Sequence, residues 1–337
     1  MNKKPIIVID ANGNDHGPSV IAQAISEFLN ENPNFSIYIV GDKKELDNHL
    51  LSQVDQFDLH IVDNDKIAKL SENPRLVLKE DSSMKQALEL FKEKEADAFI
   101  SSGDSGSLLT LSTFIAKRID GVSRPAFMPF FPTIQGRRFL LLDVGANISV
   151  KPEFLYEWGI VASEYSKAML GTTNPKVALL NIGTESYKGP DFIQEAKKML
   201  EESNLNYQGF TESKELLRTD MDVILCDGYA GNMALKAYEG ALLSVKDLLE
   251  SSIKAKVIRM IGYLLAKGAF KNLAKKIEFR DIGGAFVVGI NGIVIKSHGS
   301  SDKRQFKGAI YQAKKAIETN LLQKVKDATK DKINNES

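Results

Sequence analysis

Residues 4–25 read KPIIVIDANGNDHGPSVIAQAI, and this stretch decides the fold. Four apolar β-forming residues run into Asp10, a polar turn containing Asn, Gly, Asp and His follows, and an amphipathic helical pattern then begins. The pattern predicts a buried strand that ends in a strand-to-helix turn. Ligands of open α/β sheets bind at the carboxyl ends of strands, so Asp10 and His16 are candidate site residues. The alternative is that this turn only caps the helix.

The same strand-then-helix alternation continues along most of the chain. The expected helices are residues 18–31, 43–54, 83–95, 105–119, 152–170, 190–202, 232–250 and 303–329. Alternation of this kind predicts an α/β fold with three layers, a mostly parallel sheet between helices on both faces. We expect residues 1–330 to form one α/β catalytic unit, either a single body or two closely joined lobes, and residues 331–337 to form a frayed tail.

The composition excludes several classes of protein. The 337 residues are 43% apolar, enough for a large core, and the 44 basic residues balance the 44 acidic ones, so we expect no nucleic-acid partner. The single cysteine, Cys226, rules out an internal disulfide and a thiolate metal site. No apolar run is long enough to span a membrane, and no signal pattern begins the chain. We expect a cytoplasmic protein without a metal or cofactor.

Further glycine-containing turns follow later predicted strands. Each places short polar side chains at a strand-to-helix junction, where backbone N–H groups can approach a ligand and the helix N-terminus favours an anion. The candidate phosphate-binding residues in these turns are Gly103, Ser105, Gly106, Asp143, Asn147, Gly228, Gly231 and Asn232. Any one turn is equally compatible with ordinary capping, but in a parallel sheet such turns meet at one edge.

A second polar cluster lies near the C-terminus, in Lys296-Ser297-His298-Gly299-Ser300-Ser301-Asp302. It follows two short predicted strands, and it precedes a helix. Lys296, His298 and Ser300 make an anion-binding turn with a candidate proton donor. Ser301 or Asp302 serves equally well as a helix cap.

Motifs for covalent catalysis and nucleotide binding are missing. The chain has no G-x-G-x-x-G after its first strand, no G-x-x-x-x-G-K-[ST] and no G-x-S-x-G. Cys226 ends an apolar strand pattern, which is typical of a small core residue. The simplest compatible reaction is one in which the nucleophile is a bound oxyanion such as phosphate.

Six ordered segments together resemble the PlsX family of phosphate acyltransferases. They are DANGNDHGP, SSGDSGSLL, LLDVGAN, NIGTESYKG, DGYAGNMALK and GGAFVVGINGIVIKSHGSSD, and the resemblance spans residues 6 to about 310. The resemblance implies transfer of a long-chain fatty acyl group from acyl carrier protein to inorganic phosphate, giving acyl phosphate for phospholipid synthesis. It also implies a homodimer, a fold related to isocitrate dehydrogenase and phosphotransacetylase, and a membrane glycerol-3-phosphate acyltransferase that uses the product.

The sequence departs from the usual motifs of that family at several positions. Asn12 and Asn14 stand where Met and Gly are usual, and Asp104 replaces Asn, which adds a negative charge beside a candidate anion site. Thr184 and Ser186 replace two acids of an acidic run and leave Glu185. The replacements weaken the case for a catalytic role of that run.

Direct attack by phosphate fits both the residues and the resemblance. Backbone N–H groups of residues 103–106 or of residues 228–232 are candidates to hold the phosphate. Lys188 and Lys296 are candidates to neutralise charge. His298 and His16 are candidates to handle the proton, and Asp10, Asp143 and Asp227 are candidates to order the loops. The rival readings are a phosphotransacetylase-like acyl-CoA enzyme, an oxidoreductase of the same fold and a fatty-acid-binding protein without catalysis.

Residues 251–276 contain seven basic residues and no acidic one, with apolar residues at helical spacing. We expect a basic amphipathic helical hairpin, bent between Gly262 and Gly268 with an apolar tip. Such a surface suits an anionic membrane, the acidic acyl carrier protein or a dimer partner. The candidate contact residues are Lys256, Arg259, Leu264, Leu265 and Lys267.

Overall fold

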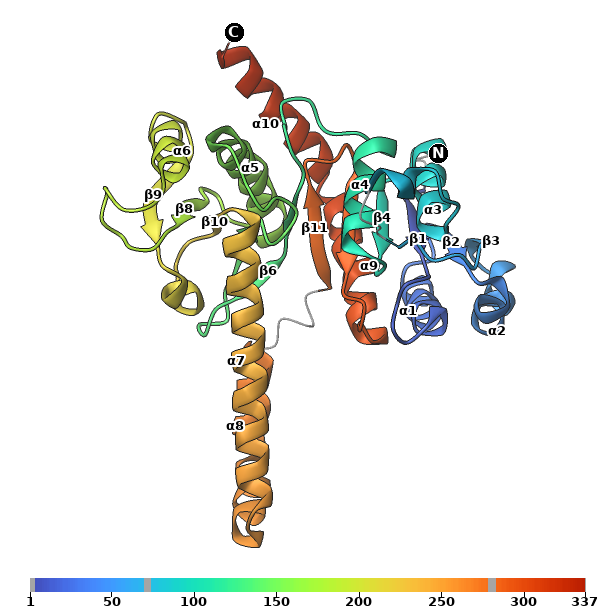
Figure 1. The fold of residues 1–337 in the computed structure, drawn as a ribbon. Coiled ribbons are helices and arrows are strands. Elements are labelled where there is room, and N and C mark those ends of the chain that lie inside the picture. The colour runs from blue at the N-terminus through green and yellow to red at the C-terminus, as the bar shows by residue number, and fades with distance from the viewer. Residues whose placement is uncertain (1–3, 70–73, 278–282, 337) are drawn as a thin grey trace.

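The computed structural model describes residues 4–69, 74–277 and 283–336, and its strands form two sheets (Figure 1). A seven-stranded sheet has the order β3-β2-β1-β4-β12-β11-β5, and a five-stranded sheet has the order β6-β7-β10-β8-β9. The α/β fold with mostly parallel strands is confirmed. The expectation that all the glycine turns share one edge is wrong, because their strands are divided between the two sheets.

The elements agree closely with the predicted alternation. The helices are α1 Pro18–Glu31, α2 Lys43–Val54, α3 Ser83–Glu93, α4 Ser105–Ile115, α5 Pro152–Tyr165, α6 Asp191–Glu201, α7 Gly228–Lys254, α8 Val257–Ile277, α9 Lys303–Glu318 and α10 Leu321–Glu336. The strands are β1 Ile6–Asp10, β2 Ser36–Gly41, β3 Asp58–Asp63, β4 Ala98–Ser101, β5 Ala126–Met128, β6 Phe130–Pro132, β7 Arg138–Leu142, β8 Lys176–Leu180, β9 Asn206–Thr211, β10 Val223–Leu225, β11 Gly284–Val288 and β12 Ile293–Ser297.

Alternating side chains of β1 supply two different cores. Ile7 and Ile9 pack with residues of α1 and α9 on one face of the seven-stranded sheet. Val8 packs with residues of α3 and α4 on the other face. Because strand side chains alternate between faces, a continuous apolar strand such as this one must be covered on both sides. The carboxyl end of β1 therefore emerges between two helical layers.

We call each sheet with the helices that cover it a lobe, the seven-stranded lobe and the five-stranded lobe. A shared core and the C-terminal helix join the two lobes. The core that contains Ile7 and Ile9 also contains Trp158 of α5 and residues of β7 and β8. Helix α10 packs against α5, and the buried Lys332 Nζ lies 3.0 Å from Glu157 Oε1. Burial keeps such a pair well shielded from water, so its loss would leave an unpaired charge.

The C-terminal segment differs from expectation in two ways. The predicted helix 303–329 is broken into α9 and α10 at Asn320, whose φ of 52° is left-handed. Residues 331–336, expected as a frayed tail, continue helix α10 in the structure. The apolar side chains Leu321 and Val325 are buried, which anchors α10 from its first turns.

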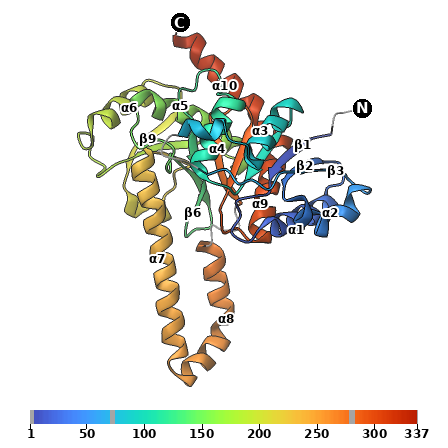
Figure 2. The same ribbon diagram turned by 45° about the vertical axis from the view of Figure 1, so that its right-hand side comes forward.

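Helices α7 and α8 form a hairpin that projects away from both lobes (Figure 2). The helices end and begin on either side of Ala255 and Lys256, so the predicted bend at Gly262 and Gly268 is wrong. Both glycines lie within α8, and nothing lies within 4 Å of a Cβ built on either. No described helix is both long and apolar enough to cross a membrane.

Large apolar side chains are exposed along both helices of the hairpin. Leu265 is 86% exposed, Val257 beside the turn is 74% exposed and Leu248 on α7 is 67% exposed. Other exposed apolar side chains of the hairpin include Leu243, Val245, Leu249, Ile258, Met260, Ile261, Leu264 and Leu273. An apolar surface of this extent is typical of a contact with another molecule.

Candidate functional site

Three polar turns meet at the carboxyl edge of the seven-stranded sheet. Strands β1, β4 and β12 are neighbours and run parallel, so the turns that follow them lie side by side. The Asp15 N–H donates to the Gly299 carbonyl at 2.8 Å, and Asn14 Nδ2 donates to the Ser301 carbonyl at 3.1 Å. The first and last motifs of the sequence are therefore joined in one site.

The turns after β1 and β4 touch through two glycines. A Cβ built on Gly13 would lie 2.6 Å from the Cα of Gly103, and the φ of Gly13 is 80°. A Cβ built on Gly103 would lie 2.6 Å from Met84 Cε. The backbone of Gly103 therefore excludes a side chain at Gly13, and a side chain at Gly103 would require the buried end of Met84 to shift.

Asp10 lies beneath these turns and is almost completely buried. Its Oδ1 accepts from Ser83 Oγ at 2.6 Å and from the Asn12 N–H at 3.3 Å, and its Oδ2 accepts from Ser101 Oγ at 2.7 Å. Burial raises the pKa of Asp10 to about 6, although these hydrogen bonds and the Lys296 charge oppose the rise.

Lys296 is a half-buried cation at the end of β12. Its Nζ donates to the Ser102 carbonyl at 3.1 Å and also to the Ser297 carbonyl. Burial lowers the pKa of Lys296 to about 8, while the charges of Asp104, Asp10 and Asp15 oppose that shift. Lys296 therefore places a positive charge directly beside the turn that leads into α4.

The two candidate histidines differ in how firmly they are placed. His298 Nδ1 accepts from the Ser300 N–H at 3.2 Å and lies 2.8 Å from Ser300 Oγ. A backbone N–H can only donate, so Nδ1 is an acceptor and the proton of the neutral ring lies on Nε2. His16 is exposed on the first turn, and its backbone N–H donates to Asn14 Oδ1.

The first turn of α4 contains backbone N–H groups that the protein does not use as hydrogen-bond donors within the described residues. Asp104 caps this helix by accepting from the Ser107 N–H at 2.7 Å. In the part of the chain that the structure describes, no hydrogen bond uses the N–H of Ser105 or of Gly106. Unpaired N–H groups at a helix N-terminus attract anions, and Lys296 adds its charge nearby.

The turn after β7, in the five-stranded lobe, is built around a different buried carboxylate. Asp143 Oδ1 accepts from the N–H groups of Phe127, Gly145 and Ala146, and its Oδ2 accepts from the N–H and Nδ2 of Asn147. Burial raises the pKa of Asp143, and the hydrogen bonds oppose that rise. Asp143 and Asn147 therefore shape their own turn.

The turn that begins α7 leaves no N–H group for a ligand between residues 228 and 231. The Gly228 N–H donates to the Asn147 carbonyl at 2.7 Å, and the N–H groups of Tyr229 and Ala230 donate to Asp227, which caps the helix. A Cβ built on Gly231 would lie 1.9 Å from the Asp143 carbonyl oxygen. These glycines permit close packing of backbone, and the N–H groups of Gly228 and Gly231, expected to hold phosphate, already donate to protein carbonyls. Asn232 lies beside Gly145.

Lys188 lies on the turn after β8 and forms an ion pair with Glu185. Its Nζ lies 2.7 Å from Glu185 Oε1, and its side chain lies over Gly183. Asn181 Nδ2 donates to the Lys188 carbonyl at 2.9 Å and closes the turn. Glu185, the acid that remains in the altered run, thus holds the lysine rather than pointing into a separate site.

The turns of the five-stranded lobe carry exposed apolar side chains that the sequence analysis missed. Five large ones follow β7, β8 and β10: Ile148, Ile182, Tyr187, Tyr229 and Met233. The turns meet the other lobe where Val144 and Ala146 pack against the core that contains Val8 and Leu108. The sequence did carry a signal for these residues, because each large apolar residue stands within a polar turn motif, and helix capping does not require an apolar residue there.

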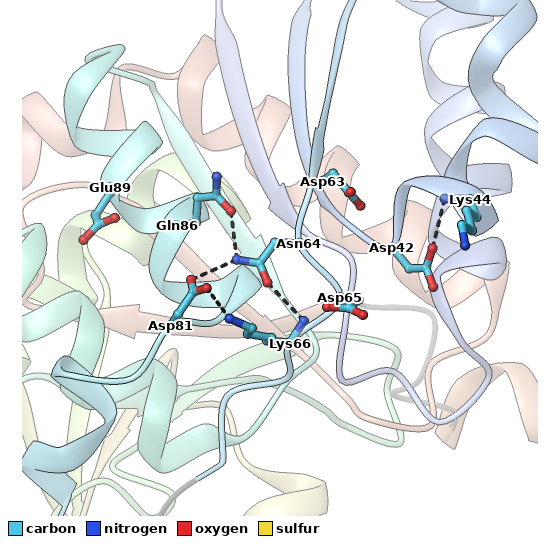
Figure 3. Close-up of a pocket in the computed structure, with 9 residues that line it drawn as sticks. All are labelled: Asp42, Lys44, Asp63, Asn64, Asp65, Lys66, Asp81, Gln86 and Glu89. Carbon is cyan, nitrogen blue, oxygen red and sulfur yellow. Dashed lines mark hydrogen bonds and ion pairs between the residues drawn. The ribbon is translucent and has the colours of Figure 1, made fainter.

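A polar pocket of about 630 Å³ lies beside the three turns of the seven-stranded lobe (Figure 3). Asn64 joins it to the site, because Asn12 Nδ2 donates to the Asn64 carbonyl at 2.8 Å. Its charged lining is Asp42, Lys44, Asp63, Asp65, Lys66, Asp81 and Glu89. Carboxylates outnumber lysines there, so the pocket repels an anion. Within the described ranges, no group of three or more His, Cys, Asp or Glu side chains is arranged to hold a metal ion.

The fold and these turns define a two-lobed α/β enzyme with a candidate anion site at the end of β4. The chain belongs to a family of phosphate acyltransferase enzymes, because the family model described as "Fatty acid synthesis protein" matches residues 6–324. A phosphate acyltransferase of Mycoplasmopsis agalactiae is 45% identical over 328 residues, with 97% of this chain and 98% of the relative covered. One of Clostridium perfringens is 36% identical, with 98% of each chain covered.

Solved structures with the same fold include two acyl-transferring enzymes. A phosphotransacetylase from Streptococcus pyogenes has a TM-score of 0.59 at 19% identity, with 94% of this chain and 95% of that chain covered. A branched-chain phosphotransacylase from Enterococcus faecalis has a TM-score of 0.55 at 14% identity, with 92% and 98% covered. The resemblance to the PlsX family and the phosphotransacetylase-like fold are both confirmed.

Proposed function

We propose that the enzyme transfers a long-chain fatty acyl group from acyl carrier protein to inorganic phosphate and so forms acyl phosphate. The observation that carries the proposal is the position of the Lys296 ammonium beside the first turn of α4, where the N–H groups of Ser105 and Gly106 have no acceptor among the described residues. An ammonium and two backbone donors at a helix N-terminus together suit a small multivalent anion.

The proposed reaction is a direct acyl transfer without an enzyme nucleophile. A phosphate oxygen attacks the thioester carbonyl carbon, a carbon–oxygen bond forms, and the carbon–sulfur bond breaks with its electron pair on sulfur. Lys296 and Lys188 are the cations available to stabilise the negative charge of the tetrahedral intermediate. His298 can donate its Nε2 proton to the departing thiolate, because Ser300 keeps Nδ1 as an acceptor.

The acyl donor is proposed to approach along the five-stranded lobe. Ile182 and Tyr187 are each more than three-quarters exposed on the turn after β8 and would cover part of an acyl chain. Lys188 lies on the same turn. In this arrangement the polar turns of one lobe take the phosphate and the apolar turns of the other take the acyl group.

The hairpin of α7 and α8 is proposed to place the enzyme at an anionic membrane surface, as a cytoplasmic, peripherally associated homodimer. Exposed Leu264 and Leu265 stand near Lys256, Arg259 and Lys267 in sequence, which combines apolar area with positive charge. A membrane glycerol-3-phosphate acyltransferase would then receive the acyl phosphate directly. Contact with acyl carrier protein or with a second copy of the chain would use the same surface.

The activity is tested with palmitoyl-loaded acyl carrier protein and inorganic phosphate. We expect acyl phosphate and free thiol in equal amounts, with carrier-bound acyl groups used in preference to acyl-CoA. Preference for acyl-CoA would replace the proposal with the phosphotransacetylase-like reading. Absence of product from both donors, with fatty acid bound tightly, would favour a binding protein.

Hairpin function is tested by sedimentation with anionic liposomes. Val257→Glu with Ile258→Glu, beside the turn, and Leu264→Glu with Leu265→Glu, further along α8, should each abolish sedimentation and leave acyl phosphate formation intact. The matched control is Leu51→Glu with Ile67→Glu, which adds the same charge to exposed sites elsewhere. Unchanged liposome binding in both hairpin variants would remove the membrane role, and loss of the dimer would support packing between copies.

A further inference from the structure

Hydrogen bonds on either side of one backbone turn, residues 101–103, connect Asp10 to the cation of the candidate site. Asp10 accepts from Ser101, Ser101 accepts from the Gly103 N–H, and the Ser102 carbonyl between them accepts from Lys296. We infer that Asp10 is a positioning residue which, through Ser83 and Ser101, fixes the turn that holds Lys296 beside the first turn of α4. The inference rests on the proposed function, because phosphate is its probe.

The hydroxyl of Ser101 couples Asp10 to the backbone of this turn. Its one proton is given to Asp10 Oδ2 at 2.7 Å, which leaves its lone pairs to accept the Gly103 N–H at 3.0 Å. Ser101 is fully buried, so water cannot replace either partner without a local opening. Loss of the carboxylate acceptor therefore changes the bonding of Ser101 and of Gly103 together.

Ser83 supplies a second fixed point. It is the first residue of α3, and its Oγ donates to Asp10 Oδ1 at 2.6 Å. Asp10 thus ties α3 to the ends of β1 and β4. The contact between Gly13 and Gly103 leaves no room for this turn to shift toward the first one. The position of the Ser102 carbonyl, and with it that of the Lys296 ammonium, follows from these constraints.

Direct contact between Asp10 and a substrate is opposed by its surroundings. The residue is 1% exposed, and both carboxylate oxygens accept hydrogen bonds from the protein. Lys296 is the charged group that acts on Asp10, and Asp104 and Asp15 act in turn on Lys296. A general base needs an open path to the proton that it abstracts, whereas a positioning residue does not.

The test compares Asp10→Asn, Ser101→Ala and the double variant in the acyl phosphate assay. A displaced turn should raise the KM for phosphate by about 30-fold to 100-fold in each single variant, with the KM for the acyl donor changed less than about threefold. Because both residues act through one contact, the double variant should be no worse than about threefold beyond the poorer single variant. The Gly103 amide should exchange its hydrogen faster in all three.

The matched control is Glu157→Gln, a buried carboxylate on α5 that accepts from Ser123 Oγ at 2.9 Å and lies outside the candidate site. It should leave the KM for phosphate unchanged even if stability falls. Multiplicative losses in the double variant, or a fall in kcat with an unchanged KM for phosphate, would overturn the inference and make Asp10 a catalytic residue. An inactive wild type would instead refute the proposed function, and the Gly103 exchange rates would still decide whether Asp10 holds the turn.

Discussion

Each lobe ends a central strand in a buried aspartate, yet the two carboxylates are held in different ways. Asp10 at the end of β1 accepts mainly from two serine hydroxyls, and Asp143 after β7 accepts from four backbone N–H groups and an asparagine side chain. A hydroxyl can reverse its role and accept, whereas an N–H group can only donate. Asp10 can therefore take up a proton if one serine hydroxyl reverses its hydrogen bond, whereas Asp143 has no hydroxyl partner among the described residues that can do so.

This contrast separates a site from a scaffold. Around Asp143 the backbone donors are consumed within the turn, and the side chains left exposed are apolar ones such as Ile148. Near Asp10, the backbone N–H groups of Ser105 and Gly106 in the first turn of α4 remain unpaired in the described part of the chain, and Lys296 lies close to them. The two turns look alike in sequence, and the difference lies in where their hydrogen bonds go.

The largest expected effect is the loss of Asp143. Asp143→Ala leaves the backbone N–H groups of Phe127, Gly145, Ala146 and Asn147 without their acceptor, so we expect the free energy of unfolding to fall by about 4 kcal/mol. Asp10→Ala should cost less, about 2 kcal/mol, because it leaves fewer donors without an acceptor, namely two serine hydroxyls and the Asn12 N–H. Urea denaturation of both variants checks the order. Equal losses would contradict the contrast between amide and hydroxyl partners.

The next effect concerns the glycines that look like phosphate-binding residues. Gly231→Ala should lower the free energy of unfolding by about 3 kcal/mol, because the new methyl group would meet the Asp143 carbonyl. Gly262→Ala in the exposed α8 is the control, and it should stabilise the protein by up to about 1 kcal/mol. A stable Gly231→Ala enzyme that had lost only its phosphate affinity would restore the anion-binding role of that turn.

An effect of similar size follows from the pKa of Asp10, which burial raises to about 6. Folding favours the protonated acid, so the stabilisation is fully present below the ordinary pKa of an aspartate and is lost as the pH rises through about 6. Asp10→Asn removes this ionisation, and its free energy of unfolding at pH 8 should be about 3 kcal/mol higher than that of the wild type.

The difference between Asp10→Asn and wild type should disappear toward pH 4 in thermal denaturation. The variant would then be more stable and less active, as expected where a strained site serves function. A pH-independent difference would show that the charge of Asp10 is not the cause.

The smallest effect is expected at the paired lysine of the five-stranded lobe. Glu185→Gln breaks an exposed ion pair and should change the free energy of unfolding by less than about 0.5 kcal/mol. Activity is then the informative readout, because the substitution frees Lys188 without removing it. A large stability loss would mean that Glu185 supports the turn as Asp143 does.

Local signals predicted most helices, including α1 and α2 at both ends, because caps and apolar spacing act over a few residues. Helix α7 begins four residues earlier than expected, because its two early glycines resemble a turn. The division into two sheets was not predictable, since strand pairing depends on distant segments and β5 and β6 have only three residues each.

The sequence predicted which residues lie in the polar turns, but it could not predict which of these turns has N–H groups available for a ligand. Polar turns at strand ends were found at every expected motif, and β11 and β12 are the two expected short strands. The sequence could not tell Gly106 from Gly228, because the difference is whether a backbone N–H is already used. The hairpin bend was misplaced because exposed glycines are tolerated within a helix, whereas Ala255 and Lys256 carry no turn signal.

The most direct measurement is a titration of the isotopically labelled protein with inorganic phosphate, observed through its backbone amide resonances. We expect the largest and saturable shifts at Ser105 and Gly106, with Gly228 and Gly231 unaffected and with binding weakened in Lys296→Ala. Saturable shifts confined to Gly228 and Gly231, with Ser105 and Gly106 unchanged, would contradict the assignment of the anion site to the seven-stranded lobe.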